Sequence, residues 1–305
     1  MAKSISRKYY RKNIRFILYF LLFVGSSILL ILQFTDRQLT INVEPKSEEE
    51  SVILPKTLIF VITPTYKRYT RIADMTRMSN TLRHVPNIHW ILIEDGEEKS
   101  ELLVELLDHS KIPYTYLVYK TAAGYPRRGW YQRDMALTYL RENHKKLTVG
   151  YDHAVVFFGD DDNSYDTRLF TDYISNVKTV GIWAVGLVGG APFESPKVEN
   201  GKVVGWHVRW MPKRKFATDM AGFAFSLKSV LDHPKALFGK SCKRGGGAPE
   251  PCLLEDLGFN SSMLEPFGFN TPPGKRRQIL VYHTKTNNPK KYPKYDLYGY
   301  GIELK

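Results

Sequence analysis

The chain has 305 residues, of which 43% are hydrophobic and 13% aromatic, and its formal net charge is +13. So many apolar side chains exclude a chain without a folded core, and they can fill one large core or two smaller ones. The positive charge suits an anionic ligand, although a basic surface can also serve solubility alone.

The N-terminal region has the pattern of a membrane anchor. Six basic residues and no acidic one occur at 1–15, and 16–34 is a run of nineteen uncharged residues rich in Leu, Ile and Phe. As a helix this run is about 28 Å long, enough to cross a thin bilayer. A cleaved signal peptide is the alternative, because 25–27 are small residues, but the apolar run continues to Phe34. Because the positive charge precedes the run, we predict a cytoplasmic tail at 1–15, a signal anchor at 16–34 and a luminal remainder.

The rest of the chain remains basic. Removing six positive charges from +13 leaves about +7, because no acidic residue is removed with them. A basic luminal domain suits an anionic ligand or acceptor, and the luminal compartment argues against a nucleic-acid partner. Residues 35–56 are polar, contain three consecutive Glu at 48–50, and are predicted to form a stem before a folded domain at 57–305.

Cys242 and Cys252 are the only cysteines. In an oxidising lumen they permit a disulfide that closes a small loop and adds about 2–3 kcal/mol of stability. A buried pair of thiols is the alternative. Asn260 begins the only N-glycosylation sequon, which gives weak support to a luminal domain.

From residue 57 onward, predicted strands alternate with predicted helices. Apolar runs indicate buried strands, and segments with helical spacing lie between them. The strands are expected at 58–62, 90–93, 114–118 and 154–158, and the helices at 69–82, 102–107 and 131–143. This alternation predicts an α/β fold with a mostly parallel sheet and helices on both faces. After about residue 181 the pattern indicates mixed β structure.

Three of the strands end in polar residues, at 63–66, 94–95 and 160–162. Parallel strands bring such ends to one rim, where open α/β sheets bind ligands. The last of these ends is a run of three aspartates, whose charges repel one another unless a cation neutralises them. Carboxylates without nearby His or Cys suit Mg²⁺ or Mn²⁺ rather than Zn²⁺. A solvated acidic turn is the alternative for the triplet alone.

An ordered set of motifs over about 230 residues resembles glycosyltransferase family 43, the glucuronosyltransferases that attach glucuronic acid in β1,3 linkage to galactose. The short tail, the anchor and the stem also match the layout of that family. The resemblance implies a GT-A-like nucleotide-diphospho-sugar transferase fold, with a UDP-sugar half at 57–180 and an acceptor half at 181–305. The motifs are Thr63-Pro-Thr-Tyr66, Ile93-Glu-Asp95, Arg128-Gly129 with Gln132-Arg133, 158–165, 183–190, 219–224 and His283-Thr-Lys-Thr286.

By this resemblance the donor is UDP-glucuronic acid and the cofactor is Mn²⁺, with Asp162 as the direct metal ligand. Asp160 and Asp161 hold the sugar, the ribose and neighbouring arginines. The Tyr66 ring can stack on uracil, and Asp95 can accept a hydrogen bond from the uracil N–H. The remaining donor-binding residues implied are Pro64, Arg128, Arg133 and His283.

Glu250 is the predicted general base. Inverting transfer needs a carboxylate that removes the proton of the acceptor hydroxyl as it attacks the sugar C1. Glu250 occupies the family's position for this group, and Pro251 agrees with a helix that begins there. Glu255 and Asp256 are the competitors. The preceding loop is two residues longer than the family pattern, which leaves a donor contact of Arg244 open.

The resemblance places galactose contacts at Glu194, Trp210, Arg214 and Asp219. It implies transfer to the galactose 3-hydroxyl of the Gal-Gal-Xyl linker of proteoglycans by a type II protein of the Golgi membrane, and the family tends to form homodimers. Two alternatives remain: the same chemistry on Gal-GlcNAc of glycoproteins or glycolipids, and a luminal lectin-like protein without turnover.

Overall fold

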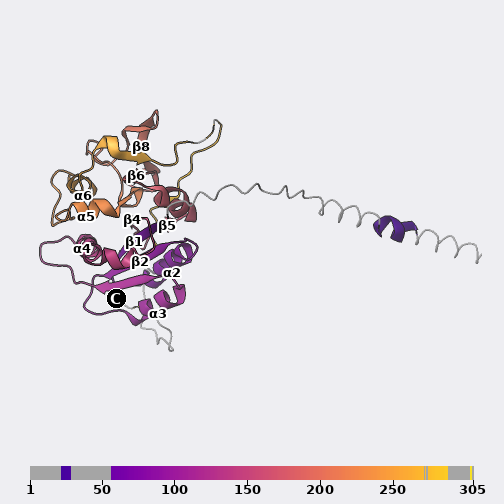
Figure 1. The fold of residues 1–305 in the computed structure, drawn as a ribbon, viewed down its shortest axis with the longest axis horizontal. Helices are drawn as coiled ribbons and strands as arrows, with labels where there is room; N and C mark the ends of the chain where they lie inside the picture. The colour runs from indigo at the N-terminus through magenta and orange to yellow at the C-terminus, as the bar shows by residue number, and fades with distance from the viewer. Residues whose placement is uncertain (1–21, 29–55, 271, 273, 288–302, 304–305) are drawn as a thin grey trace, which may run out of the picture. The chain divides into compact units, whose positions relative to one another are not determined.

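The computed structural model describes residues 22–28, 56–270, 272, 274–287 and 303 (Figure 1). The chain divides into two units, Met1–Leu54 and Pro55–Lys305. In the first unit, 22–28 are helical. None of the helices in the described ranges has both the length and the apolar character that a membrane crossing requires. Most of the predicted anchor lies outside the described residues, as do the tail and almost all of the stem, so these remain predictions.

The second unit is built on a seven-stranded sheet with the strand order β11-β6-β10-β4-β1-β2-β3. Strands β1 to β4 run parallel to one another, which confirms the predicted parallel sheet. On the other side of β4 the sheet is mixed, because β10 pairs antiparallel with both β4 and β6, and β11 runs parallel to β6. The bounds are β1 Thr57–Thr65, β2 Ile88–Glu94, β3 Tyr114–Val118, β4 His153–Phe158, β6 Val180–Ile182, β10 Phe223–Ser226 and β11 Leu264–Pro266.

Helices cover both faces of this sheet (Figure 1). Side chains alternate along β1, so that Ile59 and Val61 pack with the residues of α2 and α3, whereas Phe60 and Ile62 pack with those of α4, α5 and α6. Each face therefore has its own apolar core. The helices are α2 Arg71–Leu82, α3 Glu101–Ser110, α4 Trp130–Leu147, α5 Leu227–Asp232 and α6 Glu250–Asp256.

A second sheet has the order β5-β12-β7-β8-β9, from Ser164–Tyr165, Val281–Tyr282, Val185–Gly186, Phe193–Glu199 and Lys202–His207. The boundary at 180/181 drawn from the sequence runs through both sheets, since β6, β10 and β11 belong to the seven-stranded sheet and β5 to the second. Short turns of π or 3₁₀ helix lie at Leu169–Tyr173, Ile174–Asn176, Met220–Gly222 and Ser261–Met263.

The predicted elements are confirmed with small changes at their ends. The expected extended segment at 114–118 is β3 without change. Helix α4 runs four residues further than predicted, because His144, Lys145 and Lys146 are good partners for the negative end of a helix dipole. Strand β10 was not predicted from the sequence. Cys242 and Cys252 form the disulfide, with their Cα atoms 5.8 Å apart.

Candidate active site

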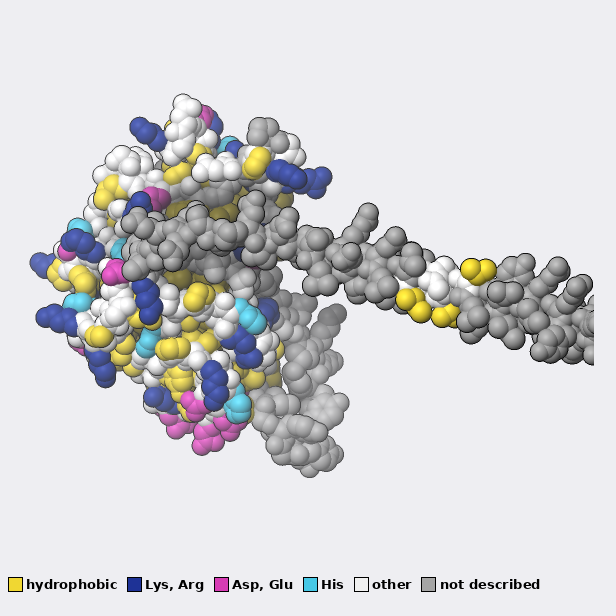
Figure 2. Space-filling view, turned by 45° about the vertical axis from the view of Figure 1, so that its right-hand side comes forward, with side chains coloured by type: hydrophobic (Ala, Val, Ile, Leu, Met, Phe, Trp, Pro, Cys, Tyr) yellow, Lys and Arg dark blue, Asp and Glu magenta, His cyan; other side chains and the backbone are white. Residues whose placement is uncertain are grey.

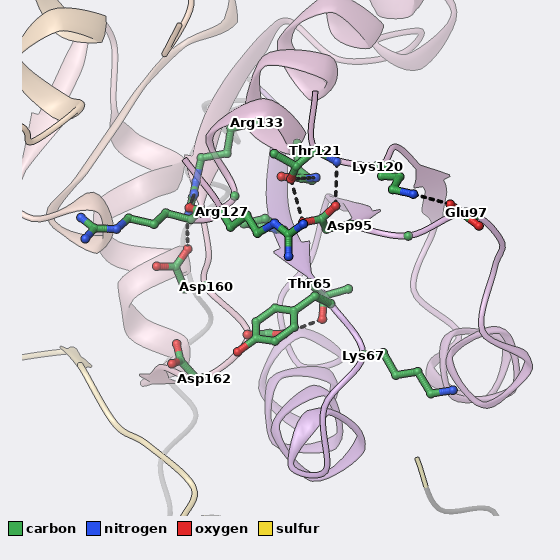
Figure 3. A pocket seen from close by; sticks show the side chains of 17 residues that line it. Thr65, Lys67, Asp95, Glu97, Lys120, Thr121, Arg127, Arg133, Asp160 and Asp162 are labelled. Atoms are coloured by element: carbon green, nitrogen blue, oxygen red, sulfur yellow. Dashed lines mark hydrogen bonds and ion pairs between the residues drawn. The ribbon is translucent and has the colours of Figure 1, made fainter. Parts of the chain in front are cut away.

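A cleft of about 750 Å³ lies at the carboxyl ends of β1, β2 and β4. It is the rim at which the polar strand ends were expected to meet. Figure 3 shows Asp160 and Asp162 on one side of the cleft, and Lys120 and Glu97 on the opposite side. Eight residues predicted for donor binding line it: Pro64, Tyr66, Asp95, Arg128, Arg133, Asp160, Asp161 and Asp162.

The three consecutive aspartates have three different environments. Asp160 forms an ion pair with the buried Arg133. Asp161 is buried and accepts hydrogen bonds from Thr65 Oγ1 at 2.6 Å and from Arg68 Nη1 at 2.8 Å. The carboxylate of Asp162 has no hydrogen-bond or ion-pair partner within the described part of the chain. Burial, together with the charges of Asp160 and Asp161, raises the pKa of Asp162 to about 6.

This arrangement limits how a cation could bind. Within the ranges that the structure describes, no three His, Cys, Asp or Glu side chains converge on one point. Asp162 alone has its carboxylate available, because Asp160 and Asp161 are engaged with arginines. Mg²⁺ and Mn²⁺ bind through one or two carboxylates together with water and the phosphates of a substrate, so the donor set fits such an ion when a nucleotide is bound.

Asp95 is held firmly at the end of β2. Its two carboxylate oxygens accept hydrogen bonds from the backbone N–H and the hydroxyl of Thr121, each at 2.7 Å (Figure 3). Gln132 Nε2 donates to the same hydroxyl at 3.2 Å. Tyr66 lines the same cleft. Its side chain is 55% exposed, and the Arg68 guanidinium lies 5.1 Å from its ring centre. An exposed aromatic face and a fixed acceptor can together bind a nucleobase.

Side chains of both charges line the cleft, five of them basic and five acidic. Lys67, Lys120, Arg127 and Arg128 are exposed along its wall, and only Lys120 has an acidic partner there, Glu97. Over the wider surface in Figure 2, Lys and Arg side chains are spread over the face and its outline, and the largest group of Asp and Glu lies at the lower edge. The exposed cations on the cleft wall can bind an anionic group such as a diphosphate.

Glu250 is the first residue of α6 and is buried, with 8% of its surface exposed. Its Oε2 atom makes no hydrogen bond in the described structure, and the nearest cationic atom, Arg214 Nη1, is 3.8 Å away. Burial, with the charge of Asp219, raises the pKa of Glu250 to about 7, against the opposing effect of Arg214 and Arg133. A carboxylate with this pKa can accept and release a proton near neutral pH.

The predicted galactose contacts surround Glu250. Arg214 lies between the Oε2 atoms of Glu194, at 3.5 Å, and of Glu250, and its guanidinium is 4.9 Å from the Trp210 ring centre. Trp210 is 45% exposed, so one face can meet a sugar ring. Burial raises the pKa of Glu194, whose Oε1 lacks a hydrogen-bond partner in the described residues.

His283 links the two sides of the site. It does not line the cleft, but its Nε2 lies 3.0 Å from Asp219 Oδ1. Although burial would lower its pKa, the hydrogen bond to Asp219 and the charges of Asp219, Asp160 and Asp162 raise the pKa of His283 to about 9. An imidazolium at this position lies within the field of both the aspartate run and the acceptor-side carboxylates.

Several site residues were missed by sequence reasoning. Arg68 bridges Asp161 and Asp74, at 2.8 and 2.9 Å, and Thr121 orients Asp95. Arg68 follows Tyr66 by two positions, so a basic residue on a predicted rim was the available signal; Thr121 had none. Arg244, whose donor contact the sequence leaves open, pairs with Glu255 at 2.8 Å and with Asp256 at 2.7 Å on the surface. Asn260, of the predicted sequon, is exposed.

Comparisons with known proteins identify the family of this chain. The family model of glycosyltransferase family 43 matches residues 78–287. Galactosylgalactosylxylosylprotein 3-beta-glucuronosyltransferase 2 of Canis lupus familiaris is 41% identical over 259 residues, which cover 82% of this chain and 75% of that protein. The Homo sapiens form is 41% identical over 81% of this chain and 75% of its own.

Galactosylgalactosylxylosylprotein 3-beta-glucuronosyltransferase 1 of Rattus norvegicus is 40% identical, over 76% of this chain and 70% of that protein. Among solved structures, that of S. aureus TarS aligns with a TM-score of 0.47 and 14% identity, over 74% of this chain and 36% of TarS. The match of the family model and the identity to its members confirm the resemblance seen in the motifs: the chain belongs to glycosyltransferase family 43.

Proposed function

We propose that this protein transfers glucuronic acid from UDP-glucuronic acid to the 3-hydroxyl of a terminal galactose on the Gal-Gal-Xyl linker of proteoglycans, with inversion at C1. The observation that carries the proposal is Glu250, a buried carboxylate among the acceptor-side residues with a pKa of about 7 and with an oxygen that makes no hydrogen bond in the described structure. The names of the relatives, 3-beta-glucuronosyltransferases of galactosylgalactosylxylosyl protein, support this donor and acceptor.

In the proposed reaction Glu250 takes the proton of the galactose 3-hydroxyl while that oxygen bonds to C1 of the sugar. The bond from C1 to the β-phosphate oxygen breaks, and UDP leaves with its electron pair. Arg214 and Trp210 orient the galactose by charge and by stacking, and Glu194 accepts a hydrogen bond from a sugar hydroxyl. The open Oε2 of Glu250 is then occupied by the incoming hydroxyl, which removes the cost of leaving it unpaired.

On the donor side, Tyr66 and Asp95 bind uracil, and Arg133 and Asp160 bind the sugar and ribose. Asp162 would hold Mn²⁺, the ion implied by the family. When bound, this ion would neutralise the negative charge of the diphosphate. Arg128 and His283 supply further positive charge to the donor, and Arg128 is exposed on the cleft wall for this contact.

We further propose that the protein is a single-pass type II protein of the Golgi membrane, with the catalytic unit in the lumen. The supporting feature is the apolar run at 16–34 after six basic residues. A protease-protection assay on intact microsomes tests this. A catalytic unit that is digested without detergent would contradict it.

The activity is tested with the purified full-length chain, UDP-glucuronic acid, Mn²⁺ and a panel of galactosides. We expect UDP release with Gal-Gal-Xyl, more slowly with Gal-GlcNAc, and a β1,3 product by NMR. Preference for Gal-GlcNAc would change the acceptor but keep the chemistry. Binding of galactosides without UDP release on any of them would instead favour a lectin-like protein.

A further inference from the structure

A buried charge cluster lies behind the donor cleft and is not used by the mechanism. Its centre is Arg71, the first residue of α2, which has no exposed surface. Arg71 Nη1 donates to Glu94 Oε1 at 2.5 Å, and Nε donates to Glu303 Oε2 at 2.6 Å. Nη2 donates to the other oxygen of Glu303. The two carboxylates thus bind all three nitrogens of the guanidinium, although Glu303 is separated from Arg71 by 232 positions in the chain.

Two neutral side chains donate further hydrogen bonds to these carboxylates. The Tyr116 hydroxyl donates to Glu94 Oε2 and accepts from the Ser100 backbone N–H at 2.9 Å. Ser100 Oγ donates to Glu303 Oε1 at 3.0 Å. Glu94 and Glu303 are both about 5% exposed. A buried ion group with this many hydrogen bonds is costly to break, because any charge left without its partner stays out of water.

Two segments of the donor cleft begin at this cluster. Glu94 directly precedes Asp95 and Gly96, which line the cleft, and its Cγ lies against Gly96, 3.3 Å from the position a Cβ would take there. Arg71 ends the segment that starts with Tyr66 and includes Arg68, the partner of Asp161. A shift of Glu94 would therefore move Asp95, and a shift of Arg71 would move the segment that carries Tyr66. These are the two groups predicted to bind uracil.

We propose that Glu303 is a positioning residue for nucleotide binding: it completes the Arg71 cluster and so fixes the ends of β1 and β2 from behind. This inference rests on the proposed function for the identity of the nucleotide as UDP. Glu303 does not line the cleft, so its effect should appear in donor affinity and not in the chemical step.

The test is Glu303→Gln in the full-length chain, with Glu199→Gln as the matched control, since Glu199 makes its 2.8 Å ion pair with Lys197 on the surface. We expect Glu303→Gln to raise the Kd for UDP and the KM for UDP-glucuronic acid by about fivefold, with kcat within about twofold of the parent. Glu303→Gln leaves Arg71 paired with Glu94, whereas the double variant Arg71→Gln with Glu303→Gln leaves the buried Glu94 carboxylate without a cation. The double variant should therefore bind UDP more weakly than Glu303→Gln alone.

A folded Glu303→Gln protein that binds UDP as the parent does would overturn the proposal, and so would a fall in kcat at unchanged KM. If Glu303→Gln does not fold, Ser100→Ala is tested in its place, because it removes one hydrogen bond to Glu303 and no charge. An unchanged UDP affinity in Ser100→Ala would then overturn the proposal. A parent that binds UDP but transfers no glucuronic acid defeats the proposed function and leaves the binding test of Glu303 valid.

Discussion

The two sides of the site differ in how their buried carboxylates are hydrogen-bonded. On the donor side most carboxylates already have protein partners: Asp95 binds Thr121, Asp161 binds Thr65 and Arg68, and Asp160 binds Arg133. On the acceptor side two carboxylate oxygens, Glu194 Oε1 and Glu250 Oε2, are buried without a hydrogen-bond partner in the described structure, as is Arg214 Nε. On the donor side the buried atoms in that state are Gln132 Oε1 and Arg133 Nε, and neither belongs to a carboxylate.

The difference separates recognition from reactivity. Paired groups hold their geometry before the ligand arrives, and this preorganisation lowers the cost of binding a nucleotide. Unpaired buried groups cost stability, and proteins keep them where chemistry needs a raised pKa or an open acceptor. The predictions below test this contrast, from the largest expected effect to the smallest.

Glu250→Gln should lower the rate of transfer without changing nucleotide binding. Gln has the same shape but cannot take a proton, so kcat should fall by roughly 10²–10⁴-fold. The Kd for UDP should stay within about twofold, because Glu250 does not line the donor cleft. Single-turnover kinetics and calorimetry measure the two effects. Turnover equal to that of the parent would exclude Glu250 as the base, and Asp256→Asn, on the surface of the same helix, is the control.

Asp162→Asn should remove the predicted metal ligand of the donor side, the carboxylate that has no protein partner within the described residues. We expect a loss of activity of roughly 10²-fold and a UDP affinity that no longer increases when Mn²⁺ is added. UDP titrations with and without Mn²⁺ measure the second effect directly. An equal response to Mn²⁺ in the variant and the parent would remove Asp162 from the metal site.

The pH profile should separate the two sides in one experiment. Glu250 must be deprotonated to act, so kcat/KM should rise as pH increases towards about 7. His283 should help the donor only as a cation, so the profile should fall again near pH 9. His283→Asn should abolish the upper limb and keep the lower one. Glu255→Gln is the control and should keep both limbs. If the lower limb shifts in His283→Asn but not in Glu255→Gln, the assignment of the lower limb to Glu250 is wrong.

The buried carboxylate of Glu250 also has a stability cost. Folding raises the pKa of Glu250 from 4.5 to about 7, so the folded state binds more protons than the unfolded state between these values, and stability falls as pH rises through them. Glu250→Gln should therefore be more stable than the parent above pH 7, by about 1–3 kcal/mol, and no more stable below pH 4.5. Urea unfolding at pH 5 and pH 8 checks this, with Glu199→Gln as the unaffected control.

Much of this site was predictable because its residues follow strands that are visible in the sequence. The apolar run at 154–158 predicts β4 and thereby places Asp160 to Asp162 at the rim, and the same reasoning places Tyr66 and Asp95. The motifs of the family added Glu250, which no strand pattern indicates.

Other contacts depend on distances that the sequence does not encode locally. The pairing of Arg68 with Asp161 spans 93 positions, and that of Arg71 with Glu303 spans 232. Both are ion pairs that only the finished fold brings together, and no period or spacing marks them. The antiparallel β10 was missed for a related reason, because its place between β4 and β6 is decided by packing of its four buried residues.

The insertion of β10 between β4 and β6 has a mechanical consequence. Ala224 pairs with Phe157 on one side and with Gly181 on the other, so the strand that leads to the aspartates and the strand that follows Asp219 share a hydrogen-bonded ladder. Within 56–270, the donor and acceptor regions are therefore joined by one continuous β-sheet and not by a linker. Hinge rotation of one half against the other would break the hydrogen bonds of this ladder. We therefore expect substrate entry and product exit to use local movement of the loops at the rim.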